Sequence, residues 1–524
     1  MIDARLPWQP GLRPLVFILV LATILRLLWI HTPLIDDHRW RQADTAAMAR
    51  NLSEHGFDIF YPEVDWGGPH GYVESEFPLM AAIVGVTFKI FGQEDYYGRL
   101  VSVAFSTATV AATFALATEL ATPAAGLAAA YLFAVSPSAV FFGRTLMPDS
   151  AMVFFWVFGV FAFVRHFRTG GSAGGSASHA NRRWLWLGSA SATLACLTKL
   201  PAVVMFAPIA AAAWHWRGKA ALRDRALLAA VALPLLVTFA WYWHAAGIYR
   251  QTGLTFGILL YPAKTYPVSV APGPWPHAWS KVTALATLTG RDFYLKMLGR
   301  MYHVVLMPWG LVGAVAGAAM WKRADGRIVA DAWFTAMIVF IVATAEVNLT
   351  HEYYQLPLIP VAALYFGIAA APFFEGNWTL VDGKGMARSV VLVVAAVLAF
   401  HFSNVTISHF RRGELDSRMF VAGRMTGNVV PADALVVVVD DHGVTSPLLL
   451  YFAHRKGWSL GVENLYPQVI DGLRRQGARY FATTVWPQIE RERPDTAYYL
   501  RRFSQVPLQG EPEGMAIFEL VAER

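Results

Sequence analysis

The sequence predicts a mainly α-helical membrane protein, with a polytopic bundle of about eleven transmembrane helices followed by a small C-terminal soluble α/β domain. Of the 524 residues, 56% are hydrophobic and only 15% are charged, and the mean hydropathy is +0.41. A soluble domain carries about 25% charged residues. The apolar residues also gather in runs of roughly the 20 residues that cross a bilayer. A change of composition near residue 404 predicts the soluble domain.

Eleven apolar runs are consistent with membrane spans. They lie at residues 14–31, 100–118, 124–142, 150–165, 184–198, 201–216, 226–243, 303–320, 330–347, 356–373 and 389–403. No small-residue cleavage site follows the first run, so we expect an anchored helix rather than a removed signal peptide. A further run, 77–92, is short and contains Lys89. We interpret it as an interfacial or re-entrant helix within a long first outer loop, 32–98.

The basic residues predict the orientation of the chain. They cluster between spans, and every cluster falls on one side if the N-terminus is cytoplasmic. The clusters contain Arg5, Arg13, Arg165, Arg168, Arg182, Arg183, Arg217, Lys219, Arg223, Arg225, Lys322, Arg323, Arg327, Lys384 and Arg388. A net charge of +7 distributed in this way is typical of membrane orientation rather than of nucleic-acid binding. The single cysteine, Cys196, excludes an intramolecular disulfide.

The chain after the last span changes character. A β-branched run at 434–441 predicts a strand, 469–477 predicts a helix that stops at a glycine, and 478–485 predicts a second strand. We therefore expect a transmembrane domain at 1–403, with a second long outer loop at 244–302. A periplasmic α/β domain is expected at 404–524.

Ionisable residues gather at the outer ends of the predicted spans. A charged side chain at bilayer depth costs about 2.5–3.5 kcal/mol on insertion scales, so its placement is informative. The stretch "PLIDDHRWRQADTAAMARNLSEHG" opens the first outer loop and is rich in acids and arginines. The outer-end residues are Asp36, Asp37, Asp44, Glu74, Glu76, Arg144, Asp149, Lys199, His351, Glu352 and Tyr354. Stretches far apart in sequence thus deliver polar groups to one face, which indicates a shared outer site.

Several of these stretches carry a family resemblance. They are "ARNLSEHG" in the first outer loop, "ESEFPL" before "FGQEDYYGRL", "TLMPDS" at the start of the fourth span, and "LTK" and "HEYYQLPLIP" at later outer ends. Over most of residues 1–400, the layout resembles the GT-C glycosyltransferases that use polyprenyl-phosphate sugars. It is similar in particular to the bacterial branch related to aminoarabinose (lipid A) transferases and protein O-mannosyltransferases. The resemblance implies a GT-C-type helix bundle.

The resemblance also implies roles for individual residues. Such enzymes place an aspartate in the first outer loop as the base for the acceptor hydroxyl, which we match to Asp37, with Asp36 and Asp44 as alternatives. The relatives have Asp-Glu followed by a tyrosine-containing helix, whereas this chain has "DDHRWRQADT". Glu76 and Asp149 resemble acids that can bind a divalent metal. The other implied contacts are with the donor phosphate for Lys199, Arg144, Arg39 and Arg41, and with substrate for Glu74, Glu76, Asp149, His351, Glu352 and Tyr354.

The function implied is transfer of a sugar from an undecaprenyl-phosphate-linked donor to an envelope lipid, polysaccharide or protein, with inversion at the anomeric carbon. Cations that stabilise the departing phosphate and a carboxylate that accepts the acceptor's proton suit this chemistry. We expect a multi-pass protein of the bacterial inner (plasma) membrane that contacts membrane lipids and no nucleic acid, with its active site on the periplasmic face.

Two alternatives remain open at this point. One is a transporter or flippase for lipid-linked sugars, and the other is a non-catalytic subunit of an envelope polysaccharide complex. Each site residue also has a structural interpretation. The first-loop aspartates could pair with neighbouring arginines, Asp149 could cap a helix, and Lys199 could extend to the membrane interface.

Overall fold

The computed structural model describes residues 12–169, 179–259, 285–322, 326–374, 414–444 and 446–523, together with positions 393, 397, 400, 401 and 404. The chain forms two compact units. Unit 1 contains Met1–Ile30, Arg99–Trp241 and Trp279–His409. Unit 2 contains His31–Gly98, Tyr242–Ala278 and Phe410–Arg524. Each unit is thus assembled from three separate stretches of sequence.

Unit 1 is helical throughout its described residues. Its elements are α1 (Leu12–Leu27), α4 (Asp95–Leu120), α5 (Pro123–Val135), α6 (Pro137–Phe142), α7 (Asp149–Thr169), α8 (His179–Thr198), η1 (Leu200–Met205), α9 (Phe206–Arg217), η2 (Gly218–Arg223), α10 (Arg225–Thr252), α12 (Leu285–Thr289), α13 (Arg291–Arg300), η3 (Met301–Val305), α14 (Met307–Met320), α15 (Arg327–Ala343), α16 (Ala345–Thr350), η4 (Glu352–Gln355) and α17 (Leu358–Phe374). The first turn of α4 and the last part of α10 belong to unit 2.

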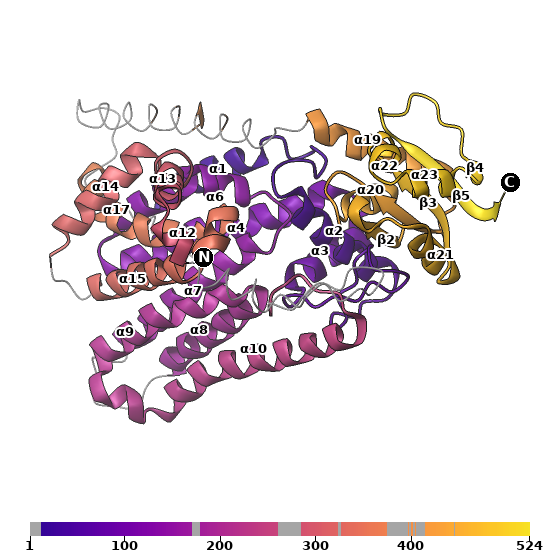
Figure 1. Ribbon diagram of the computed structural model, residues 1–524. Coiled ribbons are helices and arrows are strands. Elements are labelled where there is room, and N and C mark those ends of the chain that lie inside the picture. Colours follow the sequence, from indigo (N-terminus) through magenta and orange to yellow (C-terminus); the bar gives the residue numbers. More distant parts are fainter. Residues whose placement is uncertain are drawn as a thin grey trace, which may run out of the picture. The chain divides into compact units, whose positions relative to one another are not determined.

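The helices of unit 1 pack in pairs along their length. α7 lies beside α8 (Figure 1), and α17 packs against both α5 and α14. Glycines permit the close approach: a Cβ atom at Gly317 of α14 would overlap the carbonyl oxygen of Tyr365 on α17. Small residues at such contacts are typical of helices in membranes, where tight van der Waals packing drives association.

The helices coincide with the expected spans wherever the structure describes them. Among the described residues, three helices are long and apolar enough to cross a membrane, namely α4, α7 and α10. Residues Arg291–Val305 and Met307–Met320 form a further candidate that bends by 103°. The expected span at 124–142 is divided between α5 and α6, because Pro137 cannot continue the hydrogen bonding of α5. The span expected at 389–403 lies largely outside the described residues, so the count of eleven stays a prediction.

The run at 77–92 forms α3 (Leu79–Phe91), a helix of 13 residues. At about 1.5 Å per residue it is too short to cross a hydrocarbon core of about 30 Å. It packs against α2 (Arg39–Glu54) in unit 2. The length of α3 supports the interpretation of 77–92 as an interfacial or re-entrant helix.

A buried arginine connects three helices of unit 1. The Arg26 side chain is fully buried in α1. Its Nε donates to Ser106 Oγ at 2.7 Å, and its Nη1 donates to the carbonyl oxygens of Ala22 at 3.0 Å and Ala134 at 2.9 Å. These acceptors satisfy a charge that would otherwise be costly among apolar helices.

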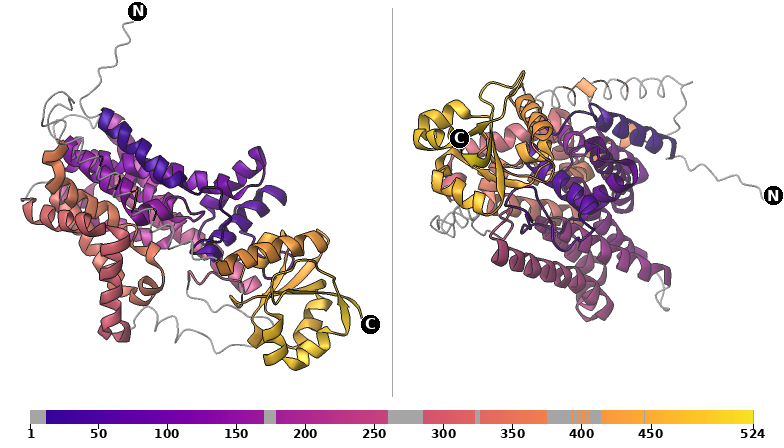
Figure 2. Two further views of the ribbon diagram at one scale, coloured as in Figure 1. Left: turned by 90° about the horizontal axis from the view of Figure 1, so that it is seen from above. Right: turned by 90° about the vertical axis from the view of Figure 1, so that its right-hand side faces the viewer.

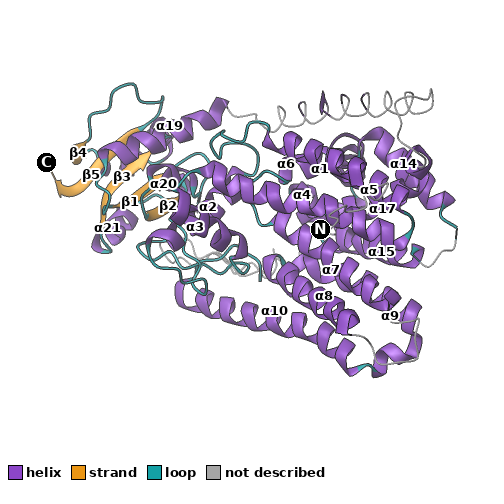
Figure 3. Ribbon diagram, turned by 180° about the vertical axis from the view of Figure 1, so that it is seen from behind, coloured by secondary structure: helices purple, strands orange, loops and turns teal. Residues whose placement is uncertain are grey.

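Unit 2 contains a five-stranded sheet in the order β2-β1-β3-β5-β4 (Figures 2 and 3). Strands β1, β2 and β3 are parallel, whereas β5 runs antiparallel to β3 and β4. Besides α2 and α3, its elements are α19 (Glu414–Val429), β1 (Leu435–Val439), α20 (Leu448–Ala453), β2 (Gly457–Leu460), η5 (Val462–Asn464), α21 (Pro467–Arg475), β3 (Ala478–Thr483), α22 (Trp486–Glu492), α23 (Pro494–Leu500), β4 (Phe503–Gln505) and β5 (Ala516–Glu523).

The sheet confirms the expected C-terminal α/β character. β1, α21 and β3 coincide with the strand, helix and strand predicted at 434–441, 469–477 and 478–485. Val437, Val439 and Phe481 lie in one apolar core with residues of α21, α22 and α23. α19 packs against α20. Whether the residues from 404 onward fold independently stays a prediction.

The segment 65–68, within the expected first outer loop, is hydrogen-bonded to this sheet. Gly68 N donates to Gly457 O at 2.7 Å, and Gly457 N donates to Asp65 O at 3.0 Å. Gly457 also begins β2 beside β1, and a Cβ atom there would overlap the carbonyl oxygen of Val436. The residue therefore lies where three backbone segments of unit 2 meet, and only glycine fits without displacement.

We expect Gly457→Ala to destabilise the protein by about 1–3 kcal/mol, since the backbone around it would have to shift. Gly472→Ala is the matched control, because a Cβ atom at this position in α21 meets nothing within 4 Å. The control should be neutral or stabilise the helix by roughly 0.5–1 kcal/mol. Thermal unfolding of the purified full-length variants measures both effects. Equal melting temperatures for the two variants would contradict the role assigned to Gly457.

Candidate active site

A buried ion pair lies at the ends of two helices in unit 1. Asp149 is the first residue of α7, and Lys199 directly follows α8. Because α7 and α8 pack together, the start of one meets the end of the other. Lys199 Nζ lies 2.8 Å from Asp149 Oδ1, and the side chains are 4% and 1% exposed. The packing of two apolar helices thus brings together two charged residues that are 50 positions apart.

Aromatic rings surround the lysine of this pair. Lys199 Nζ lies 4.0 Å from the ring centroid of Tyr353 and 5.0 Å from that of Tyr354. His351 stacks on Tyr353 with their centroids 5.2 Å apart. A cation over a desolvated aromatic face gains about 2 kcal/mol. The segment "HEYY" at 351–354 therefore supplies the aromatic faces that contact the Lys199 ammonium group.

The aspartate of the pair keeps one oxygen open. Asp149 Oδ1 accepts from Lys199, whereas Oδ2 is buried and has no hydrogen-bond partner among the described residues. A buried carboxylate oxygen without a donor is energetically unfavourable. Asp149 Oδ2 is therefore suited to accept a hydrogen bond from a substrate hydroxyl or to ligate a metal ion.

A second ion pair in unit 1 joins Arg300 to Glu352, the residue before Tyr353. Arg300, the last residue of α13, donates to the carbonyl oxygens of Asn348 at 2.5 Å and Leu349 at 3.0 Å. Its Nη2 also lies 3.3 Å from Glu352 Oε2. Arg300 and Tyr353 were missed by the sequence analysis. Their signal is visible in retrospect, because Arg300 immediately precedes an expected span and Tyr353 lies within "HEYYQLPLIP".

Arg144 is fully buried in unit 1. Its Nη1 donates to the carbonyl oxygens of Leu28 at 3.2 Å and Trp29 at 2.9 Å. These residues directly follow α1, where helix carbonyls lack partners within the helix. Arg144 thus stabilises the end of α1, and its expected contact with a donor phosphate stays a prediction.

The three first-loop aspartates of unit 2 have different surroundings. Asp44, on α2, is buried and accepts a hydrogen bond from Trp66 Nε1 at 2.9 Å. Burial raises the pKa of Asp44 to about 7, because the hydrogen bond from Trp66 offsets only part of the lost hydration. Asp36 is also buried, and its Oδ1 accepts from Gln42 Nε2 at 2.6 Å.

Asp37 is the half-buried member of the three. Its Oδ1 accepts from the backbone N–H of His38 at 3.0 Å. His38 precedes α2 and has φ 56°, in the left-handed region that non-glycine residues rarely occupy. Backbone strain of this kind is concentrated at functional sites. Among the expected bases, Asp37 therefore has the greatest access to a substrate.

The remaining first-loop residues form ion pairs and hydrogen bonds within unit 2. Arg41 forms an ion pair with Glu76, and its guanidinium carbon lies 4.6 Å from the ring centroid of Phe256. Arg39 Nε donates to His442 Nε2 at 3.4 Å. Glu74 is buried and accepts from Thr255 Oγ1, and burial raises the pKa of Glu74. The backbone of Glu74 also hydrogen-bonds to the backbone of Leu254 and Phe256, so Glu74 anchors the 254–256 segment.

The arrangement of the helices resembles that of known membrane transferases. ArnT from Cupriavidus metallidurans, solved with bound undecaprenyl phosphate, matches with a TM-score of 0.65, covering 97% of this chain and 98% of that chain at 15% identity. The chain has the GT-C fold. The oligosaccharyltransferase of Archaeoglobus fulgidus in the apo form matches with a TM-score of 0.61 at 13% identity, covering 96% of this chain and 73% of that chain. The resemblance inferred from the sequence, including its aminoarabinose-transferase branch, is confirmed at the level of fold.

A further solved structure and a family model also match the chain. Archaeal AglB from A. fulgidus, solved with an inhibitory peptide and a dolichol-phosphate, matches with a TM-score of 0.58 at 13% identity and covers 94% of this chain and 72% of that chain. The family model for dolichyl-phosphate-mannose-protein mannosyltransferases matches residues 75–243, a range that includes Glu76, Arg144, Asp149 and Lys199. No curated protein matches the chain in sequence.

The raised pKa of Asp44 predicts a pH-dependent stability. The unfolded carboxyl ionises near pH 4, whereas the folded one keeps its proton to about pH 7. Stability contributed by Asp44 is therefore complete below about pH 4 and is lost as pH rises through about 7. Asp44→Asn removes this loss, so we expect the variant to gain roughly 2–4 kcal/mol over wild type between pH 4 and pH 8.

The measurement compares the unfolding free energies of wild type and Asp44→Asn across this pH range. Asp58→Asn, at an exposed aspartate of the same loop, is the control and should change far less with pH. A constant difference between wild type and Asp44→Asn at all pH values would show that Asp44 is already ionised at low pH.

Proposed function

We propose that this protein is a membrane glycosyltransferase that moves a sugar from a polyprenyl-phosphate donor to an acceptor of the cell envelope. The observation that carries the proposal is the buried Asp149–Lys199 pair at the ends of α7 and α8. It places a cation and an open carboxylate oxygen at the ends of apolar helices, a combination suited to a lipid-linked phosphate. The fold supports the reaction class, because the similar ArnT and AglB structures contain undecaprenyl phosphate and dolichol-phosphate respectively.

The proposed reaction is a direct displacement at the anomeric carbon of the donor sugar. The acceptor oxygen forms a bond to this carbon as the bond from the carbon to the phosphate oxygen breaks. The bonding electrons leave with the polyprenyl phosphate, and the acceptor proton passes to a carboxylate. Attack from the face opposite to the phosphate inverts the anomeric configuration.

We assign the base to Asp37. A general base must reach the proton that it removes. Asp36 and Asp44 are buried and accept hydrogen bonds from Gln42 and Trp66, whereas Asp37 is half-buried and its carboxylate accepts from the adjacent backbone N–H of His38. Arg39 and Arg41 flank the start of α2 and add positive charge near this carboxylate.

We assign the donor phosphate to Lys199. Negative charge grows on the phosphate oxygen as the glycosidic bond breaks, so a preorganised cation stabilises the transition state more than the ground state. Tyr353 and Tyr354 hold the ammonium group in place. Asp149, His351 and Glu352 are then candidates for contacts with the sugar.

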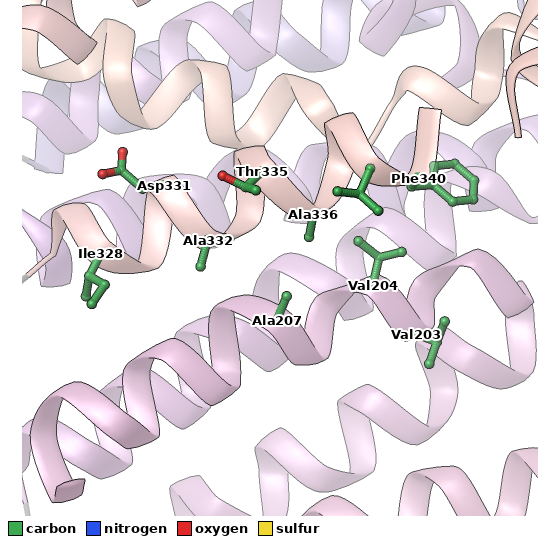
Figure 4. A pocket seen from close by; sticks show the side chains of 10 residues that line it. Val203, Val204, Ala207, Ile328, Asp331, Ala332, Thr335, Ala336 and Phe340 are labelled. Carbon is green, nitrogen blue, oxygen red and sulfur yellow. The ribbon is translucent and has the colours of Figure 1, made fainter. Parts of the chain in front are cut away.

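An apolar groove in unit 1 suits the polyprenyl chain of the donor. It has a volume of about 690 Å³ and lies between η1–α9 and α15 (Figure 4). Val203, Ala207, Ala336 and Phe340 are among its lining residues. The ring centroid of Phe340 lies 6.2 Å from that of Tyr354, which in turn faces Lys199. The groove thus leads toward the cation that we assign to the phosphate.

Of the two residues expected to bind a divalent metal, Asp149 and Glu76, the surroundings of Asp149 fit this role. Asp149 Oδ2 is an open, buried carboxylate oxygen, whereas Glu76 is already paired with Arg41. When bound, a metal would supply positive charge that neutralises the departing phosphate. Lys199 would then keep Asp149 oriented through Oδ1.

The proposed location is the bacterial inner membrane, with the N-terminus cytoplasmic and the catalytic residues on the periplasmic face. The distribution of arginine and lysine along the chain supports this orientation.

The first test measures release of free undecaprenyl phosphate by mass spectrometry. Detergent-purified protein is mixed with a panel of undecaprenyl-phosphate sugars and with envelope lipid and glycan extracts. We expect wild type to release the lipid phosphate and Asp37→Asn to lose at least about 100-fold in rate, as is typical when a general base is removed. Asp36→Asn and Asp44→Asn are matched controls and should retain more activity. If neither wild type nor any variant turns over a donor that it still binds, the transporter alternative gains support.

The second test concerns the groove. We expect Ala336→Trp to raise the KM for the lipid donor about tenfold or more, because the indole fills space assigned to the polyprenyl chain. Ile338→Trp is the control, since Ile338 is exposed on the same helix but does not line the groove. A water-soluble donor with a short prenyl chain should be affected less by Ala336→Trp. Equal KM values for both variants would place the lipid elsewhere.

A further inference from the structure

Unit 2 contains a polar cavity of about 460 Å³ that the proposed catalytic residues do not line. Its walls come from the His31–Pro33 segment, from α2, from the start of α4 and from helices α19 and α20 of the C-terminal region. The cavity is therefore assembled from the first outer loop and the C-terminal region together.

A buried arginine lines this cavity. Arg50, on α2, is only 3% exposed. Its Nη2 pairs with Asp65, and its Nη1 donates to the carbonyl oxygen of Tyr451 at 3.0 Å. Its Nε–H has no hydrogen-bond partner among the described residues. Leaving a buried charged donor unsatisfied is costly, so this group is available to an oxygen of a ligand.

The cavity offers both hydrogen-bond donors and acceptors. Arg424 of α19 and Glu94, just before α4, line it, and no ion pair or side-chain hydrogen bond involves either within the described part of the chain. Asp95 also lines it and accepts a hydrogen bond from the Tyr451 hydroxyl. The lining thus contains two carboxylates, those of Glu94 and Asp95, and two guanidinium groups, those of Arg50 and Arg424.

Aromatic rings complete the lining. His31 and Tyr96 lie with their centroids 4.7 Å apart, and Phe420 and Phe452 form an edge-to-face pair at 5.3 Å. Flat aromatic faces beside paired donors and acceptors match a sugar ring, which has apolar C–H faces and hydroxyls that both donate and accept. The carboxylates of Glu94 and Asp95 disfavour a phosphate, and the polar walls disfavour an acyl chain.

We propose that this cavity binds an uncharged sugar residue of the acceptor glycan, away from the proposed catalytic residues. This inference rests on the proposed transferase function and adds a recognition site for its acceptor. Because α19 and α20 contribute part of the wall, the C-terminal region takes a direct part in choosing the acceptor.

The test uses the full-length protein in nanodiscs of uncharged phospholipid and an array of neutral and anionic glycans. We expect binding to at least one neutral glycan. Its affinity should fall about tenfold in Arg424→Ala and in Phe420→Ala, as expected when a charged hydrogen bond or a ring contact is lost. Arg475→Ala and Tyr498→Ala are the matched controls, because both residues are exposed on α21 and α23 and neither lines the cavity.

Glu94→Gln distinguishes the class of ligand. A neutral sugar that is held by this carboxylate should bind more weakly to Glu94→Gln. Stronger binding of anionic glycans or of inorganic phosphate to this variant would overturn the proposal in favour of an anion site. Absence of binding to any neutral glycan, or equal binding by the cavity variants and the controls, would also overturn it.

Binding of undecaprenyl phosphate, followed by thermal shift, separates this inference from the proposed function. The cavity variants should keep wild-type affinity for the lipid phosphate. If neutral glycans bind at the cavity while no donor sugar is ever transferred, the transferase proposal fails and the sugar site stands. If transfer occurs but the cavity variants behave as wild type with every acceptor, only the cavity inference fails.

Discussion

Charge that is buried among apolar helices is the constraint on which the rest of unit 1 depends. Each such group must find partners inside the protein, since no water reaches it. Arg26 and Arg144 meet this need with backbone carbonyls and a serine, and in doing so they connect α1 to its neighbours. Asp149 and Lys199 meet it with each other and with two tyrosine rings. For Arg26 the first solution satisfies all three guanidinium nitrogens, whereas the second leaves Asp149 Oδ2 open.

This difference distinguishes charged side chains that only stabilise the fold from those that can also bind a substrate. A fully satisfied guanidinium such as that of Arg26 has little capacity to bind a substrate. An ion pair with an unsatisfied oxygen, at the end of two helices and near an apolar groove, keeps that capacity. The same reasoning applies in unit 2, where Asp44 is buried against Trp66 and Asp37 retains access. Burial distinguishes the three aspartates between residues 36 and 44.

The comparisons show that the chain shares its fold with ArnT and with an oligosaccharyltransferase. A fold alone does not determine a substrate, so function must be argued from the site. At 12–15% identity to the similar structures, the side chains around the acceptor are free to differ. The polar cavity lined by Arg50, Arg424 and Glu94 is a feature of this chain's own side chains. We propose it as the place where this chain recognises its acceptor.

The sequence by itself determined the helical bundle, its apolar spans and the C-terminal α/β region. Hydropathy patterns and turn residues act over short stretches, so α7, β1 and β3 could be predicted from their local sequences. It also indicated that "TLMPDS", "LTK" and "HEYY" belong to one set of outer ends. Only the tertiary structure decided that Asp149 pairs with Lys199 and that Tyr353 faces it. Arg300 and Gly457 likewise acquired their roles only there. These contacts join residues far apart in the chain, and they depend on which helices and strands pack together, which local sequence patterns do not specify.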